Sequence, residues 1–326
     1  MSARARPPAA PSLATPGGGV GISPLWTGAW RRARRSFGAR VVPVLAIVLA
    51  IIAAWYAAAF LMNAPFERDQ AARRGEEIGL SELWPLTMSQ KRPVTPAPHQ
   101  VAAELYATVV DKPVTSKRSL VYHAWVTLST TLLGFVLGTL LGVVLAVSIV
   151  HSRVLDKSLM PWIITSQTIP ILALAPMIIV VLNSLDGMPP AVPKALIATY
   201  LSFFPVAVGM VKGLRSPGTM EIDLMRSYSA SDAQTFWKLR WPASVPFLFA
   251  SMKVAVAIAL VGAIVGELPT GAVAGLGARL LSGSYYGQTV QIWSALVVAA
   301  VVAALLVVAI GLIERATLTA MGVRRA

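Results

Sequence analysis

The chain has 326 residues, of which 56% are hydrophobic and only 13% charged, with 28 Lys and Arg against 14 Asp and Glu. Soluble domains are about 45–50% apolar and about one-quarter charged, so this composition excludes a soluble single-core enzyme and a disordered chain. The absence of cysteine excludes disulfide scaffolds, thiol catalysis and thiolate metal sites. A membrane protein with several spans remains.

Six long apolar runs follow one another along the chain. A helix rises about 1.5 Å per residue and needs about 20 residues to cross the hydrocarbon core of a membrane. The runs are too long and too uniform for the strands of a barrel. We therefore predict an all-α polytopic membrane helical bundle with six transmembrane helices, at Val41–Met62, Trp125–Val150, Pro161–Asn183, Ala195–Val211, Val245–Val265 and Val290–Ile313.

Basic residues in the connecting segments predict the orientation of these spans. Arg and Lys gather before the first run, between the second and third, between the fourth and fifth, and in the C-terminal tail. The other short loops are almost free of them, so we expect both termini to be cytoplasmic. The scattered charges are typical of topology signals and contact with membrane lipid. No basic stripe interleaved with aromatic residues indicates nucleic-acid binding.

The two tails, the first apolar run and the segment that follows it differ in composition. Residues 1–39, rich in Pro, Ala, Gly and Arg, are expected to be a disordered basic cytoplasmic tail, and residues 317–326 a short second tail. The first run, residues 41–62, lacks a clear cleavage site and is expected to stay as an anchor. Residues 63–124 form a long external loop whose acids nearly balance its basic residues, with Val101–Val110 expected as an interfacial helix.

Two membrane runs carry informative patterns. Gly134, Gly138 and Gly142 lie four residues apart, so they share one helix face on which a neighbouring backbone can approach closely. The third run has prolines around the polar stretch Ser166, Gln167 and Thr168, with Pro170 two residues after Thr168. Two interpretations stay open for this stretch: it lines a transport pathway, or it is a kink whose freed carbonyls are satisfied by the neighbouring hydroxyls.

Ionisable residues near the spans are few. Lys253 is expected to extend its stem back towards the cytoplasmic interface. Glu267 either pairs with another protein group or lies exposed at the opposite interface, and it is a second candidate for the pathway. The three histidines stand apart and form no metal pair, and no phosphate-binding loop is present. We therefore expect no catalytic residues, no metal, no cofactor and no ATP hydrolysis by this chain.

The longest internal cytoplasmic segment, Gly213–Pro246, is expected to contain two short helices, Glu221–Ser229 and Ala233–Arg240. The turn Ser229–Asp232 between them resembles a helix N-cap. Apolar residues on these two helices are expected to form a surface on which a partner protein docks. The alternative is a surface loop that packs its apolar residues on its own membrane domain.

The stretch from Asp223 to Pro246, DLMRSYSASDAQTFWKLRWPASVP, resembles the EAA loop of ATP-binding-cassette (ABC) importer permeases. That pattern is roughly Glu-Ala-Ala, three residues, Gly-Ala, and a Leu-Pro before the next span. Four departures stand out, namely Asp223 for the Glu, Leu224 and Met225 for the two Ala, Ser229 for the Gly, and Trp241 for the Leu. The segments Thr165–Pro176 and Gly275–Gly277 also look like the nitrate/sulfonate/taurine-type branch, and Thr165–Pro176 looks most like pyrimidine thiamine-precursor permeases.

The resemblance implies a type I ABC importer permease in the bacterial inner membrane, with a core over residues 125–316 and a coupling loop at 213–244. Its expected partners are cytoplasmic ABC ATPase subunits, a periplasmic substrate-binding protein and a second permease copy. The implied ATPase-coupling residues are Asp223, Leu224, Met225, Arg226, Tyr228, Ser229, Ala230, Gln234 and Phe236. The competing hypotheses are a secondary transporter or channel without an ATPase, which should show internal repeats and buried acids for ion coupling, and a membrane-embedded enzyme.

Overall fold

The computed structural model describes residues 25–269 and 272–322, with side chains from residue 42 onward. Its elements are all helices joined by turns. In chain order they are α1 (Leu25–Arg74), α2 (Leu80–Met88), α3 (Pro98–Val109), α4 (Leu120–His151), α5 (Arg153–Ser166), α6 (Ile171–Asn183), α7 (Ala191–Leu214), α8 (Thr219–Ser227), α9 (Asp232–Thr235), the π-helical η1 (Phe236–Arg240), α10 (Trp241–Glu267), α11 (Leu276–Tyr285) and α12 (Thr289–Ala320).

The chain divides into two units, Met1–Ala54 and Trp55–Ala326. In the first unit, the side chains of residues 42–54 are all exposed, which suits a helix that faces lipid. Because α1 begins at Leu25, it also takes in residues 25–39 of the expected tail. Residues 1–24 and 323–326, the rest of the two expected tails, lie outside the described residues.

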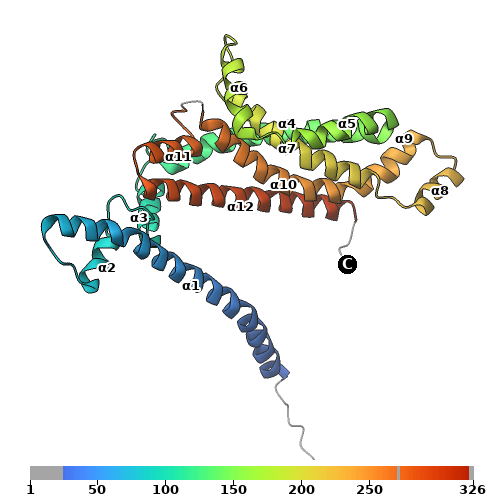
Figure 1. The fold of residues 1–326 in the computed structure, drawn as a ribbon. Coiled ribbons are helices and arrows are strands. Elements are labelled where there is room, and N and C mark those ends of the chain that lie inside the picture. The colour runs from blue at the N-terminus through green and yellow to red at the C-terminus, as the bar shows by residue number, and fades with distance from the viewer. Residues whose placement is uncertain (1–24, 270–271, 323–326) are drawn as a thin grey trace, which may run out of the picture. The chain divides into compact units, whose positions relative to one another are not determined.

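The second unit is built around α7, which packs between α4 and α10 (Figure 1). α7 is the most enclosed of the candidate spans, with 61% of its most apolar window buried. Its small residues Ala195, Ala198 and Ala207 are 1% exposed or less. α12 packs along α10, and α11 joins these two helices at the end opposite to α8. We call the two ends of this bundle the α8 end and the α11 end.

Glycines allow the three central helices to approach backbone to backbone. On α4, a Cβ atom at Gly134 would lie 2.7 Å from the Ala195 carbonyl oxygen, and one at Gly142 2.8 Å from that of Phe203. On α10, a Cβ at Gly262 would lie 2.8 Å from the Cα of Ala198. These distances are too short for any side chain, and most of the obstacles are backbone atoms. The glycine face expected on α4 is thus the face that contacts α7.

Five helical segments are long and apolar enough to cross a membrane among the described residues, or six if a bent pair counts as one span. The bent pair is α5 and α6, which meet at 98° where a single span, Pro161–Asn183, was expected. Pro161 and Pro176 lie inside α5 and α6, whereas the chain breaks before Pro170. A proline disfavours helical backbone at the residue before it, so α6 restarts only after Pro170.

The segment between the first two spans is folded onto the bundle. Asn63 at the end of the first apolar run accepts a hydrogen bond from Val94 N at 2.8 Å and donates one to the Thr95 carbonyl, also at 2.8 Å. α3 packs on α12 and α4, with Val101 and Thr108 at most 3% exposed. The stretch expected as an interfacial helix therefore lies in a helix held by protein contacts on one face.

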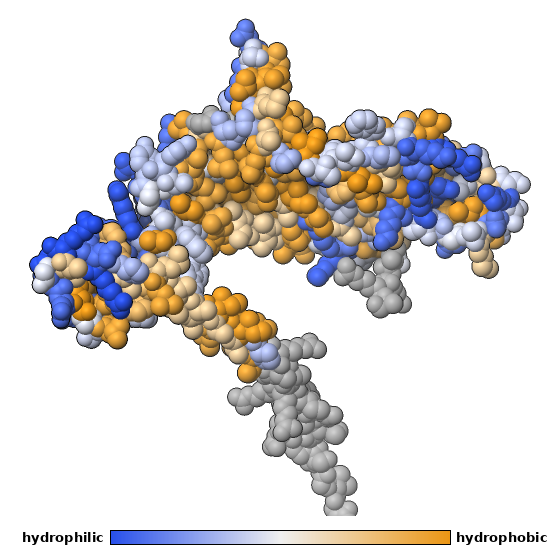
Figure 2. All heavy atoms as spheres, in the orientation of Figure 1, coloured by the Kyte–Doolittle hydropathy of each residue, from blue (hydrophilic) through white to orange (hydrophobic). Residues whose placement is uncertain are grey.

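An apolar surface covers the middle of the bundle, and hydrophilic residues gather around α8 and α9 (Figure 2). Within the bundle, Lys253 of α10 makes an ion pair with Glu314 of α12. Lys253 was expected to extend its stem towards the cytoplasmic interface. The ion pair gives it a carboxylate partner on the neighbouring helix, and a paired charge is tolerated inside a membrane protein.

We predict that Gly138→Ala lowers the free energy of unfolding of the purified protein by about 1–3 kcal/mol, the usual cost of overpacking, and so lowers its melting temperature. A Cβ at Gly138 would lie 2.1 Å from Ser202 Oγ, 3.1 Å from Thr199 O and 3.2 Å from Phe203 N, so both the serine hydroxyl and the α7 backbone would have to shift. Gly311→Ala on α12 is the matched control, because its Cβ would meet only the Lys253 Cε, at 3.7 Å. Thermal unfolding in detergent measures both, and equal stabilities would contradict the packing.

Candidate functional site

The loop at the α8 end begins with a helix that contributes nothing to the core of its own chain. No residue of α8 is buried. Its first turn is closed by a local hydrogen bond, because Gly218 N donates to the Glu221 carboxylate at 3.0 Å. Asp223 and Arg226 form an exposed ion pair on its surface at 3.0 Å. The helix is therefore held by its own caps and its neighbours in sequence.

The end of α8 depends on a left-handed residue. Ser229 has φ +51° and is the single non-glycine residue with positive φ in the described part of the chain. This conformation lets Ala230 N donate to Met225 O at 3.0 Å and Ser229 N donate to Arg226 O at 2.8 Å, the two bonds of a Schellman motif. Glycine is the usual residue at this position. Ser229 stands where the EAA pattern has its glycine. The serine adopts the left-handed conformation that glycine would adopt, so the backbone of the loop is the same.

A second cap turns the chain into α9. Ser231 Oγ accepts from Gln234 N at 3.3 Å, and the Gln234 side chain accepts from Ser231 N at 3.0 Å. This reciprocal pair is a capping box. Gln234, expected to take part in coupling, therefore already uses its side-chain oxygen to hold the turn.

Four large apolar side chains at this end are exposed. Met220, Leu224 and Tyr228 recur every four residues along α8 and its end, and they are 86%, 57% and 78% exposed. Trp237 on η1 is 62% exposed. Met225 and Ala230 are partly covered. Large apolar residues grouped on one exposed face indicate a contact with another protein. We call Met220, Leu224 and Tyr228 the α8 face.

Phe236 does not belong to that surface. It is 7% exposed, and its ring centroid lies 4.9 Å from that of His151 at the end of α4 and 6.0 Å from that of Trp241. It packs in a core cluster with Met210 and Leu214 of α7. The expectation that Phe236 anchors in a partner's groove was wrong, since the ring is used to fasten the loop to α4 and α7.

The break between α5 and α6 contains the polar residues expected along a pathway. The hydroxyls of Ser166 and Thr168 donate to carbonyls three residues earlier, at 2.7 and 2.8 Å. Tyr200 of α7 donates to the Ser166 carbonyl. The Gln167 amide donates only to Ser166 Oγ, at 3.2 Å, and is partly exposed. The hydroxyls of Ser166 and Thr168 therefore satisfy backbone carbonyls at the end of α5. The Gln167 side chain has a single hydrogen bond of this kind and remains the pathway candidate of the three.

Glu267, the other pathway candidate, is 0% exposed. Its carboxylate accepts from Thr127 Oγ1 at 2.9 Å and from Gly277 N at 2.7 Å. Thr127 Oγ1 in turn accepts from Leu276 N at 2.8 Å. The buried carboxylate thus joins α10, α4 and the start of α11, so Glu267 pairs with protein groups and does not line an open path.

The two glycines before and within α11 make room for this carboxylate. Gly275 has φ +125°, and a Cβ there would collide with the Glu267 carboxylate. A Cβ at Gly277 would lie 2.8 Å from that of Glu267. Gly275 N donates to His123 Nδ1 at 3.0 Å, so the other ring nitrogen carries the proton and donates to Lys117 O at 3.0 Å. We call His123, Thr127, Glu267 and the turn Gly275–Gly277 the α11 clamp.

Sequence reasoning missed His123 and Thr127 as members of this clamp. They lie about 140 to 150 residues from their partners, and no local pattern connects them. The signal that was present is the spacing of Glu267 to Gly275 and Gly277. Among the described residues no group of three or more His, Asp or Glu side chains could hold a metal ion.

Comparison with known proteins places this arrangement in a family. Residues 138–317, more than half of the chain, match the family described as binding-protein-dependent transport system inner membrane component. The matched region runs from the glycine face of α4 to the last turns of α12. It leaves out α2 and α3.

Two curated relatives cover most of the same region. The riboflavin transport system permease protein RibX of Chloroflexus aurantiacus is 34% identical over 222 residues, which is 68% of this chain and 78% of the relative. A probable ABC transporter permease protein of Haemophilus influenzae is 29% identical over 205 residues, 63% of this chain and 78% of the relative.

A third relative and a solved structure agree with them. The formylaminopyrimidine transport permease protein ThiX of Halalkalibacterium halodurans is 28% identical over 155 residues, 48% of this chain and 60% of the relative. The inward-facing structure of the MetNI methionine ABC transporter contains a chain with the same fold, at 21% identity and a TM-score of 0.53, covering 63% of this chain and 96% of that one. The chain belongs to the binding-protein-dependent transport system inner membrane component family, and it is a multi-pass permease subunit of an ABC importer.

Proposed function

We propose that the α8 face is the surface by which this permease receives mechanical work from a separate ATPase. The observation that carries the proposal is an exposed apolar helix face on an element without a single buried residue. Such a face is unfavourable in water unless a partner covers it. Importer permeases work with an ATPase and a binding protein, and the resemblance to the EAA loop supports this end of the bundle as the ATPase side.

The packing offers a route for the motion. Closure of an ATPase dimer around ATP would displace α8, and the capped turn at Ser229–Ser231 would carry α9 and η1 with it. Phe236 then presses on the ends of α4 and α7 from inside the core. Because α4, α7 and α10 meet through backbone contacts, they would move as a body, and such bodies alternate between discrete arrangements.

The proposal extends to assembly and topology. Both termini and the α8 end would lie in the cytoplasm, and the α11 end and residues 63–119 outside, where a binding protein delivers the solute. Two copies of the permease would enclose the pathway, with Gln167 at the break between α5 and α6 facing it. The relatives transport riboflavin, formylaminopyrimidine, sulfonates or nitrate by their names, which supports a small organic or anionic solute for this chain.

Removal of the α8 face should separate the two subunits. We predict that Leu224→Ala combined with Tyr228→Ala lowers the ATPase that co-purifies with the permease by about tenfold, since central aromatic contacts typically contribute more than about 2 kcal/mol. Tyr285→Ala at the α11 end is the matched control, because Tyr285 is 79% exposed and distant in the fold. Full retention of the ATPase by the double variant would remove α8 as the docking element.

Ser229 has a left-handed backbone and Ser227 a helical one, so replacing each by glycine should change amide hydrogen exchange in opposite directions. Ser229→Gly relieves a penalty of about 1–2 kcal/mol and should slow amide hydrogen exchange at Ala230, whose N–H bonds to Met225 O. The same change at Ser227, inside α8, should speed exchange because glycine is a poor helix residue. Hydrogen exchange with mass spectrometry distinguishes them, and faster exchange in Ser229→Gly would contradict the Schellman motif.

Gln167→Ala should lower solute uptake by membrane vesicles while leaving ATPase association unchanged. Its amide has one hydrogen bond within the chain and is accessible, whereas the hydroxyl of Thr168 is occupied by the Thr165 carbonyl. Thr168→Val is therefore the comparison and should transport at a rate closer to the wild type. Normal uptake by Gln167→Ala would assign the break to a structural kink.

A further inference from the structure

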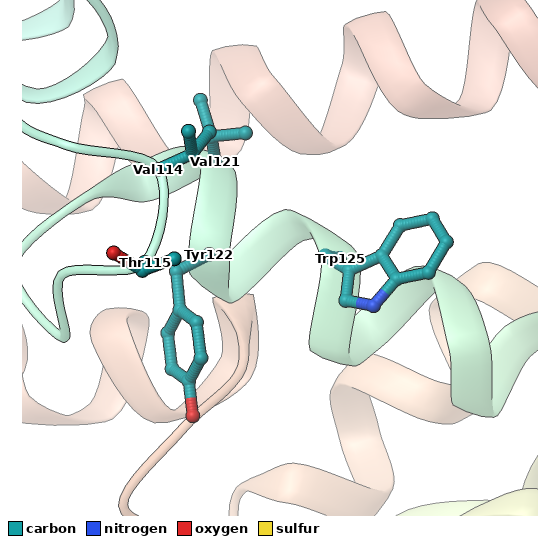
Figure 3. Close-up of a pocket in the computed structure, with 5 residues that line it drawn as sticks. All are labelled: Val114, Thr115, Val121, Tyr122 and Trp125. Carbon is teal, nitrogen blue, oxygen red and sulfur yellow. The ribbon is translucent and has the colours of Figure 1, made fainter.

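A pocket lies at the start of α4, outside the region that matches the family. It has a volume of about 350 Å³. Its lining residues are Val114, Thr115, Val121, Tyr122 and Trp125 (Figure 3). The first two come from the segment between α3 and α4, and the others from the first turns of α4, where the rings of Tyr122 and Trp125 extend from the helix. The hydroxyls of Thr115 and Tyr122 and the indole nitrogen of Trp125 are the side-chain polar groups in an otherwise apolar wall.

The position of the pocket along α4 places it where this span meets the membrane surface. α4 has 32 residues and is therefore roughly 48 Å long, more than the hydrocarbon core of about 30 Å. The uninterrupted apolar run begins at Trp125, so the turn before it lies at headgroup depth. Trp and Tyr are enriched at this depth in membrane proteins. Trp125 is 67% exposed and Val114 60%, so the pocket is open to what surrounds the protein.

The segment that forms the other wall is basic. Residues 111–118 contain Lys112, Lys117 and Arg118 against the single acid Asp111, and the last two basic residues are exposed. The backbone of this segment is fixed, because Lys117 O accepts from the His123 ring at 3.0 Å and Arg118 O accepts from Arg279 at 3.4 Å. The first amides of α4 add the positive end of a helix dipole. An apolar pocket thus opens at headgroup depth, and the exposed basic residues Lys117 and Arg118, which we call its rim, follow its lining residue Thr115 in the chain.

We propose that this pocket binds one acyl chain of an anionic phospholipid whose phosphate group is held by Lys117 and Arg118. The apolar wall suits a hydrocarbon chain, and it offers too few polar groups to orient a water-soluble solute. The rim supplies the charge complementarity for a phosphodiester. A lipid in this place braces the segment 111–119 against α4, next to the bond between His123 and Gly275 of the α11 clamp.

The two halves of the site can be tested separately by native mass spectrometry of the purified permease–ATPase complex. The probes are phosphatidylglycerol and phosphatidylcholine with identical acyl chains, titrated into detergent. We expect the wild type to retain phosphatidylglycerol about 25-fold better, from two basic residues. Trp125→Ala should weaken retention of both lipids, whereas Lys117→Gln with Arg118→Gln should remove only the preference for phosphatidylglycerol, because each basic residue near a membrane surface contributes about fivefold. Trp162→Ala on α5, where Trp162 is 74% exposed, is the control.

The outcomes that overturn the proposal are equally specific. Equal retention of the two lipids by the wild type contradicts the charged rim, and unchanged retention by Trp125→Ala contradicts the pocket. Val114→Glu provides a second variant should Trp125→Ala fail to fold, and it should weaken retention of phosphatidylglycerol by placing a carboxylate in the pocket. If Trp125→Ala spares lipid binding and weakens capture of the cognate binding protein, the pocket is a protein-docking surface and the lipid assignment is wrong.

Discussion

The membrane bundle depends on one contact, the approach of α4 and α10 to α7 at positions where no side chain fits between the backbones. Ala198 of α7 lies between Gly134 on one side and Gly262 on the other, and it is 0% exposed. Inside a membrane the hydrophobic effect does not drive helices together, so close van der Waals contact and hydrogen bonds must do it. Thr199 adds such a bond by donating to the Gly134 carbonyl at 3.2 Å. Three helices joined in this way transmit displacement along their length.

Each end of this body is fastened to a loop by a different chemistry. At the α8 end the fastening is apolar, since Phe236 is inserted among the ends of α4 and α7. At the α11 end it is polar, since the buried Glu267 carboxylate accepts hydrogen bonds from Thr127 and Gly277. A polar clamp of this kind is directional and specifies one position for the turn before α11. The bundle is therefore joined to its loop by apolar packing at the α8 end and by hydrogen bonds at the α11 end.

The sequence predicted the features that repeat locally. The apolar runs anticipated the helices, the spacing of Gly134 to Gly142 anticipated the face of α4 that contacts α7, and the turn Ser229–Asp232 anticipated the N-cap of α9. What the sequence left open depends on partners far apart in the chain. Lys253 pairs with Glu314 61 residues later, and Glu267, for which pairing and exposure were both open, accepts a hydrogen bond from Thr127 140 residues earlier. Phe236 was misplaced because a motif fixes the position of a residue along a loop and leaves open which side of the loop meets the protein.

The central claim is that the α8 face lies on the cytoplasmic side, where an ATPase can reach it. The chain has no cysteine, so Met220→Cys, at a position that is 86% exposed, would carry the only thiol. A membrane-impermeant maleimide should label it in inside-out vesicles and not in right-side-out ones, and bound ATPase should protect it. Tyr285→Cys at the α11 end should show the reverse. Labelling of Met220→Cys in right-side-out vesicles would contradict the account, because no cytoplasmic ATPase could then contact α8.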